Sequence, residues 1–170
     1  FVVGRGSACS VDIERRLEDG CLPILRALQR DGDMHYHVTG FATLETRTLA
    51  PDRIRGTHFL AAYANSGGQM LTPEERTHFE EKLRGPEMLE CEEEVVCCVR
   101  VEAVNTGAVP RYAWFKAATM SWPLSQKCSY EGRTGFTQLS SGDVLAVHRM
   151  NGRAMGDEEM AVLVPPGATT

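Results

Sequence analysis

The stretch of residues 94–117 constrains the fold of this chain more than any other part of its sequence. The first half of the stretch alternates in hydrophobicity with the two-residue period of a β-strand. One side of this strand would carry Val95, Cys97, Val99, Val101 and Ala103. The other side would carry Arg100 and Glu102, so we predict a strand that buries one face and exposes the other.

A turn and a second strand complete the stretch. Residues 105–107, Asn-Thr-Gly, interrupt the alternation, because Asn and Gly tolerate the positive φ angles of tight turns. Beyond them, Tyr112, Trp114 and Lys116 would share one face of a new strand. We therefore predict a hairpin whose second strand has one aromatic, polar face and one apolar face. The stretch contains no catalytic motif.

Short strands bounded by turn residues recur along the rest of the chain, at intervals of about 10 residues. Asp-Gly or Asn-Gly turn dipeptides stand at residues 19–20, 31–32 and 151–152. Residues 11–28 read as another hairpin, because Pro23 would interrupt any long helix there. About eight to ten such strands, without a β-helix-β rhythm, predict an all-β fold. We expect an antiparallel β-sandwich that forms a single domain over residues 1–170.

One short surface helix is predicted at about residues 73–84. Thr72 and Glu75 form a capping box, in which each side chain accepts a hydrogen bond from the other residue's amide. Gly85-Pro86 ends the helix. Its apolar stripe is thin, which is typical of a helix that lies on a surface.

The composition restricts the class of protein. With 42% hydrophobic and 24% charged residues, the chain resembles an ordinary soluble globular domain. It has no apolar run near the ~18 residues of a membrane span, and no signal peptide is visible. A net charge of −5 argues against a nucleic-acid surface, which needs clustered Lys and Arg. No cofactor is expected, and no compartment is indicated.

Six cysteines raise the question of disulfides. They are Cys9, Cys21, Cys91, Cys97, Cys98 and Cys128. No C-x-x-C pair occurs, and the two adjacent cysteines would point to opposite faces of their strand. We expect mostly reduced, buried thiols that pack as small hydrophobic side chains.

His35 and His37 are the sharpest candidates for metal ligands. Two residues apart on a predicted strand, they would face the same way, as in a cupin-like metal site. His148 or His58 would supply a further ligand. The glycine-flanked motifs of cupins are missing, and no carboxylate ligand is assigned. A small metal-dependent, cupin-like β-barrel enzyme is therefore an alternative reading.

Aromatic side chains provide a second kind of candidate site. They are Tyr36, Tyr112, Trp114, Trp122 and Tyr130. Flat rings suit the apolar faces of pyranose sugars, so some of these residues would form a sugar-stacking platform. The same rings can also fill the core and edges of a sandwich.

The run of residues 101–115, with Asn105, Gly107 and Pro110 at its turn, resembles part of a known family. It is similar to a strand-turn-strand in the N-terminal β-sandwich domain of bacterial six-hairpin glycosidases, which precedes their α/α-toroid. Further stretches that look like strands of that domain are residues 33–36, 41–43, 55–59, 150–153 and 159–167. The resemblance implies an accessory sandwich, because the catalytic acid and base of that family lie mainly on the toroid. No catalytic residue is carried over.

The resemblance implies that the chain is a non-catalytic β-sandwich module of a carbohydrate-active, glycoside hydrolase-like protein. Tyr112, Trp114 and Trp122 are its predicted carbohydrate-binding residues. Its partners would be the catalytic domain of the same longer chain and an oligosaccharide. The first residue is Phe1 and not Met, which agrees with a fragment or module of a longer chain. A third reading is a self-associating structural sandwich whose edges contact other copies.

Overall fold

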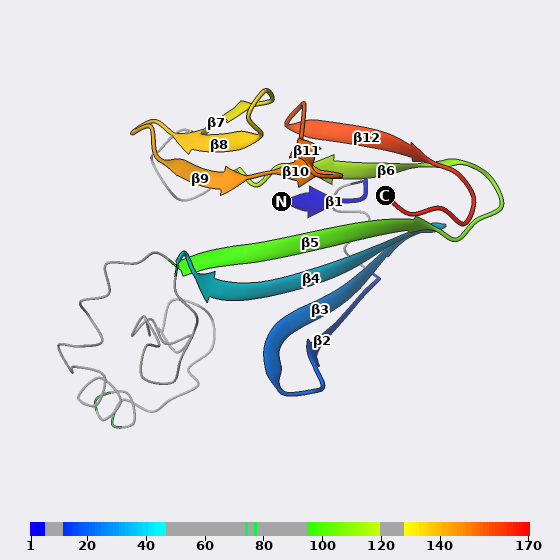
Figure 1. Cartoon of the computed structure of the whole chain (residues 1–170). Coiled ribbons are helices and arrows are strands. Elements are labelled where there is room, and N and C mark those ends of the chain that lie inside the picture. Colours follow the sequence, from blue (N-terminus) through cyan, green and yellow to red (C-terminus); the bar gives the residue numbers. More distant parts are fainter. Residues whose placement is uncertain (6–11, 47–73, 75–76, 78–94, 120–127) are drawn as a thin grey trace. The chain divides into compact units, whose positions relative to one another are not determined.

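The computed structural model describes residues 1–5, 12–46, 74, 77, 95–119 and 128–170 (Figure 1). The described residues form an all-β fold of antiparallel strands. The strands are β1 (Val2–Val3), β2 (Ile13–Glu18), β3 (Leu22–Asp31), β4 (Met34–Leu44), β5 (Val95–Asn105), β6 (Arg111–Lys116), β7 (Cys128–Glu131), β8 (Phe136–Leu139), β9 (Val144–Val147), β10 (Arg149–Met150), β11 (Arg153–Ala154) and β12 (Glu159–Val164).

The predicted surface helix lies almost wholly outside the described residues. Within its range only Glu74 and Thr77 are described, and both are helical and exposed.

The chain divides into two compact units. The first contains Phe1–Gly40 and Val99–Thr170, and the second contains Phe41–Cys98. The described strands of the second unit are the end of β4 and the start of β5.

The strands form four sheets (Figure 1). The largest has the order β2-β3-β4-β5, and a second has the order β1-β6-β12. Smaller sheets are β7-β8-β9 and the β10-β11 hairpin. Pairing is antiparallel between β2 and β3, between β3 and β4, and between β6 and each of its neighbours β1 and β12.

The predicted turns are confirmed where the chain needs a positive φ. Asp19 and Gly20, with φ of 50° and 76°, lie between β2 and β3, and Gly32, with φ of 59°, lies between β3 and β4. Asn151 and Gly152 join β10 to β11 with φ of 50° and 79°. Two consecutive positive φ angles match the twist of a tight hairpin, which is why Asn-Gly favours it.

The two larger sheets share one core. Its buried cluster contains Val3, Met34, Tyr36, Ala103, Ala113 and Val164, which come from β1, β4, β5, β6 and β12. Tyr36 is completely buried, and its ring meets Phe115 edge-on at a centroid distance of 6.0 Å. Its hydroxyl accepts a hydrogen bond from the backbone N–H of Trp114 at 3.0 Å. The fold is therefore the predicted sandwich, with its core between these two sheets.

The predicted pairing of residues 94–117 is wrong, although both strands exist. β5 lies at the edge of the four-stranded sheet, whereas β6 is the central strand of the β1-β6-β12 sheet. The connection between them therefore crosses from one sheet to the other. Asn105, fully buried, fixes this crossover: its Nδ2 donates to the carbonyls of Val109 at 2.8 Å and Val164 at 2.9 Å. Its Oδ1 accepts from the amide of Gly107 at 2.9 Å.

Asp33 holds the crossover from the β3-β4 turn. Its carbonyl accepts from the amide of Thr106 at 2.8 Å, and its carboxylate pairs with Arg111 at 2.8 Å. Gly107 lies so close that a Cβ there would stand 2.6 Å from the Asp33 carboxylate. The Asn and Gly of the predicted turn are thus required. Their role is to connect two sheets and not to close a hairpin.

Burial along β5 follows the predicted alternation only in its second half. Ala103 and Asn105 are fully buried, and Val101 is partly buried. Val99 is 43% exposed, and Cys97 is also exposed. Alternation indicates which side chains share a face, but not how far along the strand an opposing sheet extends.

The prediction of buried thiols is wrong for the four cysteines that are described. Cys21 and Cys97 are exposed, and Cys98 and Cys128 are intermediate in burial. All four are free. Cys9 and Cys91 lie outside the described residues.

The buried hydroxyl of Thr137 allows the energetic cost of an unpaired polar group in this fold to be measured. It is fully buried on β8, and its hydroxyl oxygen has no hydrogen-bond partner. A buried unpaired hydroxyl is destabilising, so Thr137→Val should raise the free energy of unfolding by about 1 kcal/mol. Urea denaturation should show a higher midpoint at an unchanged m-value. A loss of stability of similar size would show that the hydroxyl is satisfied.

Candidate functional site

An exposed apolar surface covers the outward side of the β1-β6-β12 sheet. We call it the aromatic face and define it by Val2, Tyr112, Trp114, Ala161 and Leu163. Tyr112 and Leu163 are each 55% exposed, and Trp114 is 43% exposed. Single exposed hydrophobic side chains are ordinary, but a contiguous group containing two aromatic rings indicates a contact surface.

The alternation of β6 sets this face. Ala113 is fully buried in the core, and Phe115 packs against the core cluster. Successive side chains of a strand point to opposite sides, so Tyr112 and Trp114 project outward, as predicted. The hydrogen bond from the Trp114 amide to the buried Tyr36 hydroxyl ties the backbone at this point to the core.

The two rings lie next to each other on β6. Their centroids are 6.3 Å apart, and their planes are tilted by 52°. Small residues flank Trp114 on both sides. Ala161 is its partner on β12, and Gly4, directly after β1, donates its amide to the Trp114 carbonyl at 3.0 Å. Neither neighbour has a side chain long enough to cover the indole. Tyr112 lies opposite Leu163, which extends the apolar surface.

An ion pair borders the face at one end. Lys116 pairs with Glu159 on the adjacent position of β12, and Glu158 lies 3.8 Å away. The hydrogen bond to Glu159 raises the pKa of the Lys116 ammonium, and the charge of the same carboxylate adds to this effect. The ammonium is therefore fully charged at neutral pH. Its contribution to stability is lost only as the pH rises through this raised pKa.

The remaining predicted aromatic residues lie elsewhere. Tyr36 is in the core, and the hydroxyl of Tyr130 donates to the carbonyl of Met155. Burial raises the pKa of Tyr130, and the negative charge of Asp157 adds to the shift. Trp122 lies outside the described residues. Of the predicted sugar-binding residues, the structure therefore brings together Tyr112 and Trp114.

The histidines of the metal alternative occupy different surroundings. His35 and His37 alternate on β4 with the buried Met34 and Tyr36, so they lie on the side away from the core. Nε2 of His148 accepts from the amide of Ala118 at 2.8 Å. Its Nδ1 therefore carries the proton and donates to the Gly135 carbonyl at 3.1 Å.

Metal binding by these histidines stays a prediction. Both nitrogens of His148 are already engaged in hydrogen bonds. Among the residues that the structure describes, no group of three or more His, Cys, Asp or Glu side chains is arranged to hold a metal ion. His58 lies outside the described residues.

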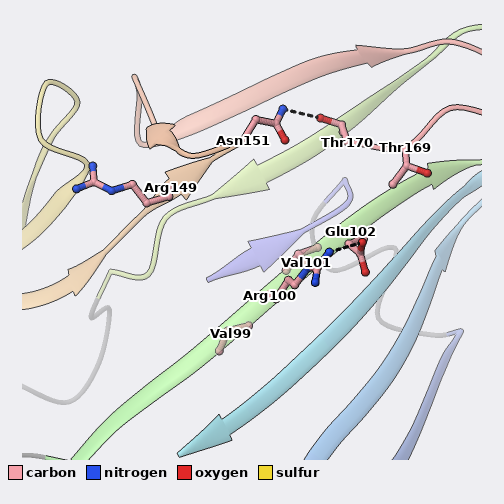
Figure 2. Close-up of a pocket in the computed structure, with 8 residues that line it drawn as sticks. All are labelled: Val99, Arg100, Val101, Glu102, Arg149, Asn151, Thr169 and Thr170. Carbon is pink, nitrogen blue, oxygen red and sulfur yellow. Dashed lines mark hydrogen bonds and ion pairs between the residues drawn. The ribbon is translucent and has the colours of Figure 1, made fainter. Parts of the chain in front are cut away.

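A pocket that the sequence does not predict lies beside β5 (Figure 2). Its volume is about 440 Å³. It is lined by Val99, Arg100, Val101, Glu102, Arg149, Asn151, Thr169 and Thr170. These residues come from three separate parts of the sequence, and none belongs to a binding motif. No periodicity or spacing signal would have found it.

Comparison with protein-family models, with curated proteins and with solved structures gave no match. Within the described part of the chain, no helix has the length and hydrophobicity needed to span a membrane.

Proposed function

We propose that this chain is a non-catalytic β-sandwich module of a carbohydrate-active protein, and that its aromatic face binds oligosaccharide. The observation that supports this most directly is the exposed pair Tyr112 and Trp114, adjacent on a central strand and flanked by small residues. The resemblance of residues 101–115 to the sandwich domain of six-hairpin glycosidases points to the same class.

The chemistry of the face suits a sugar. The C–H groups of a pyranose form apolar patches that pack on aromatic rings, while its hydroxyls need polar partners at the rim. The Tyr112 hydroxyl and the Lys116–Glu159 pair lie at or beside the rings and offer such partners. A regular sheet also holds the rings more rigidly than a loop would, which reduces the entropy lost on binding.

In a longer protein, the module would pack on a catalytic domain and add this face to the substrate cleft. The aromatic face then provides only part of the protein surface that contacts the glycan. The isolated chain is therefore expected to bind weakly. Affinity electrophoresis in gels that contain soluble glucans, xylans or mannans detects such binding. We expect the mobility of the chain to fall in at least one of these gels.

The aromatic side chains give the specific prediction. Trp114→Ala and Tyr112→Ala should each weaken glycan binding about tenfold or more, because a buried aromatic anchor contributes about 2 kcal/mol or more to an interface. Isothermal titration calorimetry with the best glycan of the panel measures the loss. Leu22→Ala is the matched control, since Leu22 is 43% exposed on β3, in the other large sheet.

The control variant should bind like the wild type, and all variants should melt within about 5 °C of it. Equal binding by the wild type and both aromatic variants would contradict the proposal. So would the absence of binding to every glycan. If the face instead docks on protein alone, no glycan will bind and the proposed sugar contact fails.

A further inference from the structure

Among the residues of β1, β6 and β12, Lys116 is the only cationic side chain on the same side as the aromatic rings. β1 and β12 contain no Lys or Arg, and β6 contains Arg111 and Lys116. Lys116 follows Trp114 by two residues and shares its side of the strand, whereas Arg111 lies on the opposite side. There Arg111 pairs with Asp33 at 2.8 Å. A sugar acid on the aromatic face would therefore depend on Lys116 for a counter-charge.

The charge of Lys116 is already compensated by two carboxylates. Glu159, its direct partner on β12, forms a hydrogen-bonded ion pair with the ammonium. A carboxylate oxygen of Glu158 lies 3.8 Å from the same nitrogen. One ammonium and two carboxylates leave a net charge of −1 at this end of the face. The side chain of Glu159 is 66% exposed, so its charge is open to a ligand.

Arg5, which follows Gly4 at the other side of the indole, is also held by a carboxylate. Its guanidinium donates to both oxygens of Asp31 at 2.6 to 3.1 Å. This pairing uses the planar fork with which an arginine would bind a sugar carboxylate. The Asp31 side chain is only 7% exposed, so removing its partner would be costly. Neither Lys116 nor Arg5 can therefore bind an acidic sugar without breaking an existing ion pair.

We propose that the aromatic face selects neutral glycans and excludes glycans that contain uronic acids. This inference rests on the proposed binding of glycan at the aromatic face, and it specifies the class of glycan. A neutral sugar on Trp114 can donate a hydroxyl proton to Glu159 and accept one from Lys116, so the existing ion pair serves both polar roles. A sugar carboxylate in the same place would meet net negative charge and would have to displace Glu159 from Lys116.

The repulsion of the two glutamates decides the size of this selection. Exposed ion pairs are weak, so separating Glu159 from Lys116 would cost little by itself. The displaced carboxylate and that of Glu158 would still lie near the sugar acid, and like charges that face each other across an interface weaken binding. We expect a loss of affinity of about tenfold at low salt. Salt should reduce this loss, because the charges are exposed and are therefore screened.

A matched pair of polysaccharide derivatives tests the selection. The glucan, xylan or mannan that binds best is prepared as its neutral hydroxyethyl derivative and as its anionic carboxymethyl derivative, whose substituent is similar in size. Isothermal titration calorimetry compares the two at about 10 mM salt, where the Debye length is about 30 Å. The carboxymethyl derivative should bind about tenfold more weakly, and the difference should fall below about threefold at about 1 M salt.

Glu159→Gln tests the role of the ion pair. The variant keeps the shape of the side chain and leaves one ammonium beside one carboxylate. The ratio of the two affinities should shift about fivefold or more toward the carboxymethyl derivative. Glu14→Gln is the matched control, because Glu14 is 68% exposed, pairs with Arg30, and lies on β2 in the other large sheet. It changes the net charge of the chain equally, so its affinity ratio should stay within about twofold of the wild type.

The possible failures of the selection and of glycan binding are distinguishable. Equal binding of the two derivatives to the wild type at low salt would overturn the selection and leave glycan binding in place. Equal shifts of the ratio by Glu159→Gln and Glu14→Gln would also overturn it, because the net charge of −5 would then repel acidic glycans without this ion pair. If neither the derivatives nor any unmodified glycan binds, the proposed function itself fails, and the selection fails with it.

Discussion

Replacing Asn105 by alanine is expected to lower the free energy of unfolding by about 3 to 5 kcal/mol. The side chain is fully buried and makes three hydrogen bonds, to the carbonyls of Val109 and Val164 and from the amide of Gly107. Alanine would leave these groups without partners and would open a small cavity. Asn105 also joins both large sheets, so its loss affects the assembly of the whole sandwich.

Urea unfolding followed by circular dichroism measures this effect. Asn151→Gly is the matched control. Asn151 is exposed and lies in a turn with a positive φ of 50°, where glycine is equally suitable, and the hydrogen bond from its side chain to the Thr170 hydroxyl is exposed and long, at 3.3 Å. The control should unfold within about 0.5 kcal/mol of the wild type. A loss below about 1 kcal/mol for Asn105→Ala would show that the crossover does not depend on this side chain.

Gly132→Ala is the second substitution with a large expected effect. A Cβ at Gly132, between β7 and β8, would stand 1.7 Å from the carbonyl oxygen of Gly156. The obstructing atom is backbone, so relief requires the segment between β11 and β12 to move. We expect a loss of about 3 kcal/mol, at the upper end of typical overpacking costs.

Gly156→Ala separates steric crowding from the general effect of adding a methyl group. A Cβ at Gly156 would meet no atom within 4 Å, although this residue forms the other side of the same contact. Its unfolding free energy should stay within about 0.5 kcal/mol of the wild type. Equal stabilities for the two variants would mean that the hairpin and the segment at Gly156 are not in contact.

The sequence predicts the strands because their periodicity is local. Tyr112 and Trp114 alternate with the buried Ala113, and the turn dipeptides at residues 19–20 and 151–152 have the positive φ angles that Gly and Asn favour. Each of these signals depends only on neighbouring residues. Strand faces and the turns at these dipeptides were therefore predictable.

Strand partners were not predictable from these local signals. The hydrogen bond that fixes the crossover joins Asn105 to Val164, 59 residues later in the chain. An Asn-Thr-Gly sequence suits both a hairpin turn and a link between sheets, so the local sequence could not distinguish them. The overestimated burial of Val99 and Cys97 has a similar cause, because the extent of the opposing sheet is a property of the whole fold.

For the candidate sites too, the sequence predicts local features but not which distant residues come together. Sequence alone places Tyr112 and Trp114 on one face, but it does not show that Gly4 and Ala161 flank the indole. Gly4 directly follows the first strand, and Ala161 lies on the last. The β5 pocket is even less accessible to sequence reasoning, because its walls depend on where residues 168–170 pair.

Trp114 fluorescence offers the most direct test of glycan binding on the aromatic face. The chain contains two tryptophans, so Trp122→Phe leaves Trp114 as the single emitting indole. Titration of this variant with the glycan that binds best should shift and saturate its emission, with the same Kd as calorimetry gives. Calorimetric binding without any change in Trp114 emission would contradict the claim, because the sugar would then bind away from the aromatic face.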